Sequence, residues 1–166
     1  MLPTVPLAMF GWPAVVIGLF AVLPARRAAL ISLVAGWMLL PIYKYDFPGI
    51  PQYDKVFAVC FPVLLATAIF HLGLLRQIRP SWLDLFVIGF CASPFLAAIN
   101  NGLGQYNGLS ETNGFIVLWM FPYVIGRIYF GSSHHLVDIL WALFLGGLIY
   151  APFCAIEILI SPQFHN

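Results

Sequence analysis

The stretch NNGLGQYNGLSETN, residues 100–113, is the longest polar, turn-forming run in a chain that is otherwise almost continuously apolar. Asn-Gly steps recur through it, and a third one straddles its end, at Asn101-Gly102, Asn107-Gly108 and Asn113-Gly114. Asn and Gly both tolerate positive φ, so each step favours a tight turn, and the side chains between them supply hydrogen-bonding groups. The stretch therefore predicts a polar, reversing segment that divides the chain in two.

A segment of this kind cannot lie in lipid with its backbone groups unpaired. We therefore expect it at a membrane face, or lining a cavity covered by protein, between a helix that ends near residue 100 and one that begins near residue 114. It is either a solvated connector between two helices or a binding loop.

The composition of the 166 residues excludes an ordinary soluble domain. Hydrophobic residues make up 62% of the chain, charged residues only 8%, and the mean hydropathy is +0.96, whereas about a quarter of the residues of soluble domains are charged. The predicted fold class is all-α, a polytopic helical membrane protein in which residues 1–166 form a single transmembrane domain. Membrane lipid is the expected partner, and the net charge of +1 argues against nucleic acid.

The residue types that hold disulfides, metals or cofactors are sparse. The three cysteines, Cys60, Cys91 and Cys154, lie inside apolar runs without CxxC spacing, so neither a disulfide framework nor a zinc site is indicated. No P-loop, dinucleotide fingerprint, nucleophile elbow or HExxH motif occurs. The sequence thus predicts no metal and no cofactor, and it does not indicate an oligomeric state.

Apolar runs predict about six transmembrane helices, because each run is long enough, or nearly so, to cross a hydrocarbon core of about 30 Å. Asp54 can cap the third run, and Ser81 with Asp84 has the capping-box pattern at the start of the fourth. The second run is shorter, either a tilted span or a re-entrant segment, and we count it as a span. The expected spans are residues 5–24, 28–43, 56–75, 85–99, 114–130 and 136–160.

The cations indicate the orientation of these spans. The loops after the first, third and fifth spans, or the ends of those spans, contain five arginines, Arg26, Arg27, Arg76, Arg79 and Arg127. The opposite loops contain only Lys44 and Lys55, and aspartates offset both. Since cytoplasmic loops carry an excess of Lys and Arg, we expect the arginine-bearing loops in the cytoplasm, and both termini and residues 100–113 outside.

Several ionisable residues near the ends of the apolar runs have two interpretations. Glu157 is either an interfacial carboxylate or a functional one that relays protons or contacts a polar substrate. His71 is either a hydrogen-bonded packing residue or a ligand. Asp138 can share a helical face with either His134 or His135. Because adjacent histidines point in different directions, we favour a wet helix entrance there over a metal site.

Arg127, in the string PYVIGRIYFG, ends the fifth run. A guanidinium at the bilayer centre costs about 2.5–3.5 kcal/mol on the insertion scale, and the neighbouring Tyr123, Tyr129 and Phe130 fit an interfacial aromatic belt. We therefore expect an anchor whose guanidinium snorkels to lipid phosphates. The alternative is a planar bidentate contact with a carboxylate such as Asp138, or with a lipid diphosphate, which lysine could not replace.

Four strings carry a resemblance to one family. They are LAMFGWPAVVIGLFAVLPARRA (7–28), PGIPQYDK (48–55), NGLGQYNGLSETNGFIVLWMFPYVIGRIYFG (101–131) and GGLIYAPFCAIEILISPQFH (146–165). Together they resemble the N-terminal region of bacterial membrane proteins labelled O-antigen polymerase or O-antigen ligase-like. Those proteins continue with further transmembrane helices, so this chain resembles their first part and is expected to be a fragment or a truncated relative.

The resemblance implies surface polysaccharide assembly in the bacterial cytoplasmic (inner) membrane. Such polymerases and ligases join glycans carried on an isoprenoid diphosphate lipid at the outer face, without a nucleotide sugar or an essential metal. The arginines and histidine associated with their catalysis match no residue here, so the catalytic residues stay unknown. The candidates for substrate contact are Tyr106, Asn107, Glu111 and Arg127.

Two alternatives stay open beside glycan assembly. A small helical transporter or channel subunit should place Glu157, His71 and the kinks expected at prolines inside four of the spans around a cavity near the bilayer midplane. A structural, non-catalytic role in an assembly is the other.

The orientation is testable with single cysteines at positions 105 and 132, in a background that lacks the three native cysteines. We expect an impermeant thiol reagent applied to intact cells to label position 105 and to spare position 132, because only residue 105 lies outside. The reverse labelling pattern would invert the topology.

Overall fold

The computed structural model describes residues 4–45 and 52–160, apart from the side chains of residues 4, 133, 157 and 160. Helices account for nearly all of these residues, and the β-structure among them is one isolated antiparallel bridge between Tyr45 and Tyr53. The predicted all-α class is therefore confirmed. The elements are α1 (Thr4–Val22), α2 (Ala25–Leu39), α3 (Lys55–Phe70), α4 (Leu72–Arg76), α5 (Trp82–Asn100), α6 (Gln105–Phe115), the π-helix η1 (Ile116–Met120), α7 (Phe121–Tyr129) and α8 (Ser133–Ile160).

Three helices are long and apolar enough to cross a membrane, by length and composition. They are the segments Val5–Val22, Trp82–Asn100 and His134–Ile156 of α1, α5 and α8. The helix α3 is apolar but has only 16 residues, and α2 has 15 residues with two arginines in its first turn. The structure thus supports three of the six expected spans by these criteria, and the count of six stays a prediction.

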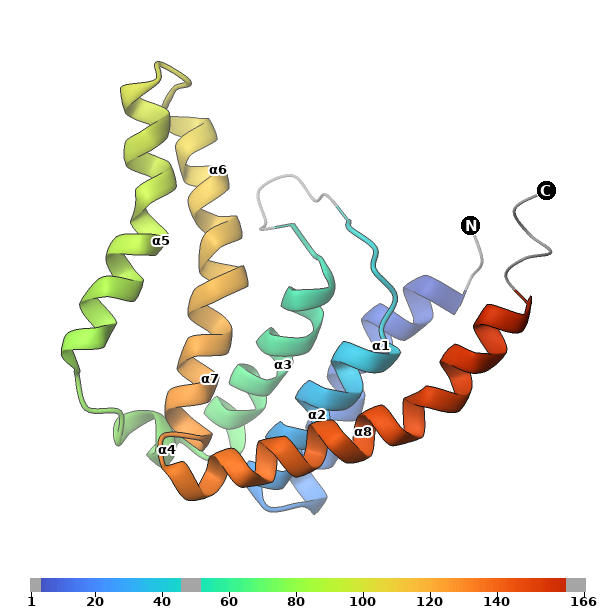
Figure 1. Cartoon of the computed structure of the whole chain (residues 1–166). Coiled ribbons are helices and arrows are strands. Elements are labelled where there is room, and N and C mark those ends of the chain that lie inside the picture. Colours follow the sequence, from blue (N-terminus) through green and yellow to red (C-terminus); the bar gives the residue numbers. More distant parts are fainter. Residues whose placement is uncertain (1–3, 46–51, 161–166) are drawn as a thin grey trace.

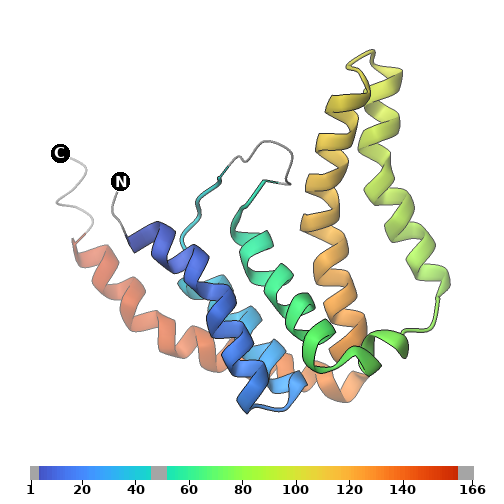
Figure 2. The same ribbon diagram turned by 180° about the vertical axis from the view of Figure 1, so that it is seen from behind.

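The helices alternate in direction (Figures 1 and 2). The helices α1 and α3 and the α6–α7 segment run toward the end of the molecule that carries α4, whereas α2, α5 and α8 run away from it. Arginines mark that end, because two begin α2, one ends α4 and one lies in the last turn of α7. The start of α1, the end of α8 and the turn between α5 and α6 lie toward the opposite end (Figure 1).

The core forms where α1, α2 and α3 pack together, with α7 against α3. Gly36 of α2 makes the closest approach, because a Cβ atom there would lie 2.7 Å from Val59 Cγ2 and 3.1 Å from Trp12 Nε1. On α3 and α7, Tyr129 Oη lies 2.7 Å from Thr67 Oγ1, a buried hydrogen bond between the two helices. Membrane helices usually associate through small residues at their contacts and a few interhelical hydrogen bonds.

Helix starts follow the predicted caps. Asp54 accepts a hydrogen bond from the backbone N–H of Phe57 at 2.8 Å, and the backbone N–H of Ser81 donates to Asp84 Oδ2 at 2.6 Å. Before α3, the Tyr53 hydroxyl donates to the carbonyl of Met9 at 2.8 Å, which attaches the connecting segment to α1. Burial raises the pKa of Tyr53, so its hydroxyl remains a donor over a wide pH range.

The expected third span, residues 56–75, is not one helix. The helix α3 ends at Phe70, and His71, with φ −138° and ψ 44°, separates it from the short α4. The backbone N–H of His71 still donates to Thr67 O at 2.8 Å, and its ring lies 6.4 Å from that of Phe20. The chain therefore bends at His71 instead of continuing straight to the arginines.

The expectation that residues 100–113 are a turn-rich loop is wrong for most of that stretch. The reversal takes only residues 101–104, where Gly102 and Gly104 adopt φ of 69° and 85°, and the chain is helical from Gln105 to Tyr129 through α6, η1 and α7. Gly108 packs closely on α5, since a Cβ atom there would lie 3.1 Å from both Ala98 Cβ and Phe95 Cδ2. The second Asn-Gly step thus provides a helix contact and not a turn.

The wide turn η1 ends at Met120, two residues before Pro122, and proline commonly kinks a helix. Single π-turns inside helices commonly mark such irregularities. The last helix, α8, spans 28 residues, or about 42 Å. It packs mainly on α2, at Gly146, where a Cβ atom would lie 2.9 Å from Val34 Cγ1.

The role of Gly36 can be tested against Gly18, a glycine of α1 whose added Cβ atom would have no neighbour within 4 Å. Replacing a helical glycine by alanine gains up to about 1 kcal/mol of helix propensity. At position 36 this gain opposes overpacking against Val59, which costs about 1–3 kcal/mol. We expect Gly36→Ala to lower the thermal unfolding midpoint in detergent and Gly18→Ala to preserve or raise it. Equal midpoints would show that the α2–α3 contact is not tight.

Candidate functional site

A polar cluster joins the start of α5 to the end of α7. Asp84 Oδ1 accepts hydrogen bonds from the Tyr123 hydroxyl at 2.6 Å and from Arg127 Nη1. Arg127 Nη1 also donates to Tyr123 Oη at 3.1 Å, and Nη2 donates to the backbone carbonyl of Arg79 at 2.6 Å. The Asp84 and Arg127 side chains are each 25% exposed, so the pair is only partly solvated.

The helix ends place these groups together for physical reasons. Asp84 lies in the first turn of α5 and Arg127 in the last turn of α7, where helix dipoles favour a negative and a positive side chain respectively. The spacing of Tyr123 and Arg127, four residues apart on α7, puts them on one face. The cluster therefore closes the α5–α7 hairpin at the end opposite the turn.

These contacts bear on the two interpretations of Arg127. Its carboxylate partner is Asp84 and not Asp138, which instead lies 3.6 Å from Arg26 Nη1 in a pair that is half exposed. The guanidinium uses two nitrogens on different acceptors, an arrangement that a snorkelling anchor does not require. The capping box had identified Asp84, but no local pattern connects it with a residue 43 positions later.

The other three candidates for substrate contact lie elsewhere. Tyr106, Asn107 and Glu111 are exposed on α6, near the turn, and Tyr106 is 82% exposed. Asn107 Nδ2 donates to the carbonyl of Leu103 at 2.7 Å. At about 1.5 Å per helical residue, Tyr106 and Arg127 are separated by about 30 Å. The structure thus places three of the four on the first two turns of α6, and it places Arg127 apart from them.

The helix α6 is polar where its neighbour is apolar. It carries the sequence QYNGLSETNGF and packs antiparallel along the second half of α5, a helix that qualifies as a membrane span over its whole length. Phe95 and Ala98 of α5 lie against Gly108, so the exposed polar side chains of α6 lie at the same height as apolar residues of α5. A polar surface at that height requires water, protein or a polar ligand beside it.

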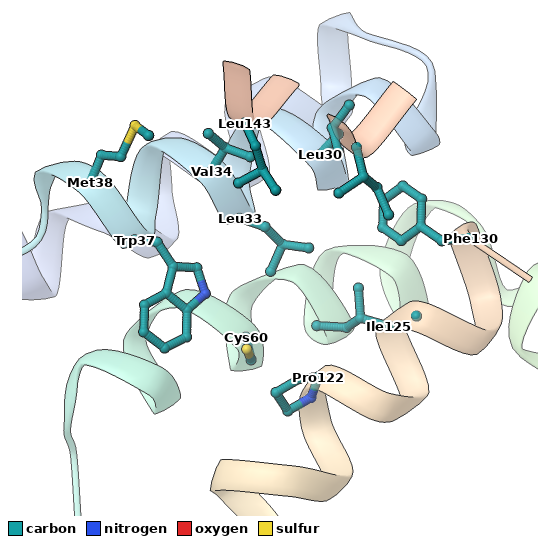
Figure 3. A pocket seen from close by; sticks show the side chains of 12 residues that line it. Leu30, Leu33, Val34, Trp37, Met38, Cys60, Pro122, Ile125, Phe130 and Leu143 are labelled. Carbon is teal, nitrogen blue, oxygen red and sulfur yellow. The ribbon is translucent and has the colours of Figure 1, made fainter. Parts of the chain in front are cut away.

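A cavity of about 250 Å³ lies among α2, α3, α7 and α8 (Figure 3). Its walls are almost entirely apolar, and Trp37, Cys60 and Pro122 lie toward one end while Leu30 and Phe130 lie toward the other. It opens to the surface of the protein.

The remaining candidates gain little support as chemical sites. Among the described residues, no group of three His, Cys, Asp or Glu side chains could hold a metal ion. His134 is exposed and His135 partly so, as the predicted wet helix entrance requires. The side chain of Glu157 lies outside the described residues. The three cysteines are free thiols.

Comparison of the chain with protein-family models, with curated proteins and with solved structures finds no match. The likeness to O-antigen polymerases and ligases therefore stays a prediction from the quoted strings. The geometry of the described residues is what can support or oppose it.

The specificity of the polar cluster can be tested by Arg127→Lys. An ammonium can reach Asp84 but cannot also donate in the plane of a guanidinium to the Arg79 carbonyl. We expect the thermal unfolding midpoint in detergent to fall by a few degrees, about as far as in Asp84→Asn, with membrane insertion and abundance preserved. Arg76→Lys, on α4, is the matched control. An unchanged midpoint in Arg127→Lys would restore the interpretation of Arg127 as a simple anchor.

Proposed function

We propose that the chain is a multi-pass component of surface polysaccharide assembly in the bacterial cytoplasmic membrane, with six crossings, and that α6 contacts a glycan carried on an isoprenoid diphosphate lipid. The observation that carries the proposal is the exposed polar surface of α6 beside the apolar helix α5. The first half of one of the four strings that carry the family resemblance, NGLGQYNGLSETNGF, forms the α5–α6 turn and α6 itself.

The position of α6 suits a substrate at the outer face. The arginines mark the opposite end of the molecule, and an excess of cations is typical of the cytoplasmic end. The exposed groups of α6 then lie in the outer half of the membrane and at its surface. A lipid-linked glycan has its sugars in that layer, because its isoprenoid chain holds it to the bilayer.

The side chains on α6 are of the types that bind sugars. Glu111 and Ser110 provide acceptors and a hydroxyl for hydrogen bonds with sugar hydroxyls, and the largely exposed Tyr106 ring provides a flat apolar face with a polar tip. These groups bind and orient, and none of them is assigned a catalytic step. The proposed role is therefore substrate contact.

The alternative of a small transporter or channel subunit has less support. A path for a polar solute requires polar groups around a cavity near the midplane. The cavity among α2, α3, α7 and α8 is lined by apolar side chains instead. Polar side chains gather on α6 and at the arginine end.

The proposal is tested by binding of lipid-linked oligosaccharides, extracted from the source bacterium, to the full chain in lipid nanodiscs. We expect Tyr106→Ala/Glu111→Gln to weaken binding by about tenfold or more, because it removes one aromatic face and one charge-assisted hydrogen bond. Gln77→Ala, an exposed polar residue at the arginine end, is the matched control and should bind as the unaltered chain does.

The isoprenoid diphosphate without a glycan is the second control and should bind equally to both chains. Equal affinity of the unaltered chain for the lipid with and without sugars would overturn the proposal, because α6 would then contribute nothing to glycan recognition.

A further inference from the structure

The apolar cavity shown in Figure 3 continues along one face of α2 toward the arginine end. Leu30, Val34 and Trp37 recur at helical spacing along that face, and Gly126 of α7 and Leu143 of α8 line the sides. These residues define the α2 groove. Its volume, about 250 Å³, is slightly below the range of about 300–1,000 Å³ that holds small ligands, so it has room for part of a hydrocarbon chain and none for a bulky polar group.

Cations lie where this groove approaches the arginine end. Arg26 and Arg27 precede Leu30 by four and three residues, so they lie about one turn beyond the groove on α2. Their side chains lean toward the helix N-terminus and therefore away from the apolar walls. Both residues are exposed, and Arg27 has no ion pair or hydrogen bond among those of the described residues.

Charged and titratable residues of α8 also lie near this mouth. Asp138 lies 3.6 Å from Arg26, and His134 and His135 lie in the first turn of α8. The single carboxylate offsets one arginine and leaves the other available to an anion. An apolar slot that ends at an available cation has the chemistry of a phospholipid, with its acyl chain in the slot and its phosphate at the membrane surface.

We propose that the α2 groove binds an anionic phospholipid of the cytoplasmic leaflet, with one acyl chain between α2, α7 and α8 and the headgroup at Arg26 and Arg27. In the proposed orientation these arginines lie in the cytoplasmic leaflet, where anionic lipids attract basic side chains. This site is separate from the glycan contact on α6, at the other end of the molecule. The lipid completes the packing of α8, whose segment His134–Ile156 has no buried residue.

The test uses Trp37, which lines the groove, as a reporter. The full chain is placed in phosphatidylcholine nanodiscs that contain a small fraction of phosphatidylglycerol with brominated acyl chains, which quench tryptophan on contact. Brominated phosphatidylcholine at the same fraction gives the reference. The difference between the unaltered chain and Trp37→Phe isolates the signal of this residue from the other four tryptophans. We expect stronger quenching by phosphatidylglycerol than by phosphatidylcholine.

Two variants address the two halves of the site. Arg26→Gln/Arg27→Gln should reduce the preference for phosphatidylglycerol by about fivefold for each arginine, whereas Arg76→Gln, a control on α4, should preserve it. Gly126→Leu fills the groove, and the absence of atoms within 4 Å of an added Cβ atom allows it to fold. It should abolish quenching by either lipid beyond the bulk level, and Gly89→Leu, an equally open position on α5, should not.

Equal quenching by the two lipids in the unaltered chain would overturn the proposal, as would a preference that survives Arg26→Gln/Arg27→Gln. A Lys55 variant distinguishes between the two leaflets, because Lys55 Nζ lies 6.0 Å from the Trp37 ring, at the opposite end of α2 from the two arginines. A preference lost only in Lys55→Gln would assign the lipid to the other leaflet and would also overturn it. None of these outcomes alters glycan binding by α6, so the two proposals fail independently.

Discussion

Backbone hydrogen bonding in apolar surroundings is the constraint on which this structure depends. With little water available, each peptide group must be satisfied within its own helix, and nearly every described residue is accordingly helical. Burial of apolar side chains cannot then drive the helices together, because lipid is as apolar as they are. The helices instead pack by approaching each other closely at glycines. These are Gly36 between α2 and α3, Gly108 between α5 and α6, and Gly146 between α2 and α8.

The need for continuous backbone hydrogen bonds also explains where the structure predicted from the sequence differs from the observed one. The caps at Asp54 and Ser81, the helical class and the arginine-rich end all follow from local patterns and are present. The Asn-Gly steps have a local preference for positive φ, but continuous helical hydrogen bonding and the contact of Gly108 with α5 outweigh it beyond residue 104. The break at His71 has no such local signal, because no proline or glycine stands at that position.

The candidate sites differ in how far the sequence could reveal them. The exposed polar groups of α6 were identifiable as a polar stretch, although their helical form was not. The contact of Arg127 with Asp84 joins residues 43 positions apart, which the chain reversal after α5 brings together, and the α2 groove depends on four helices at once. Contacts of this kind are set by tertiary packing, and they cannot be predicted from composition or periodicity.

The arginines at one end of the molecule are therefore not equivalent, although a charge count treats them alike. Arg127 is satisfied internally, by Asp84, Tyr123 and the carbonyl of Arg79, so its charge fixes one helix against another. Arg27 has no such partner among the described residues and stands beside an apolar groove. A guanidinium that is paired with acceptors inside the protein stabilises the fold and attracts other anions only weakly. An unpaired guanidinium at the membrane surface attracts anions. The same residue type thus holds the α5–α7 hairpin closed at one place and, in our proposal, recruits a lipid at the other.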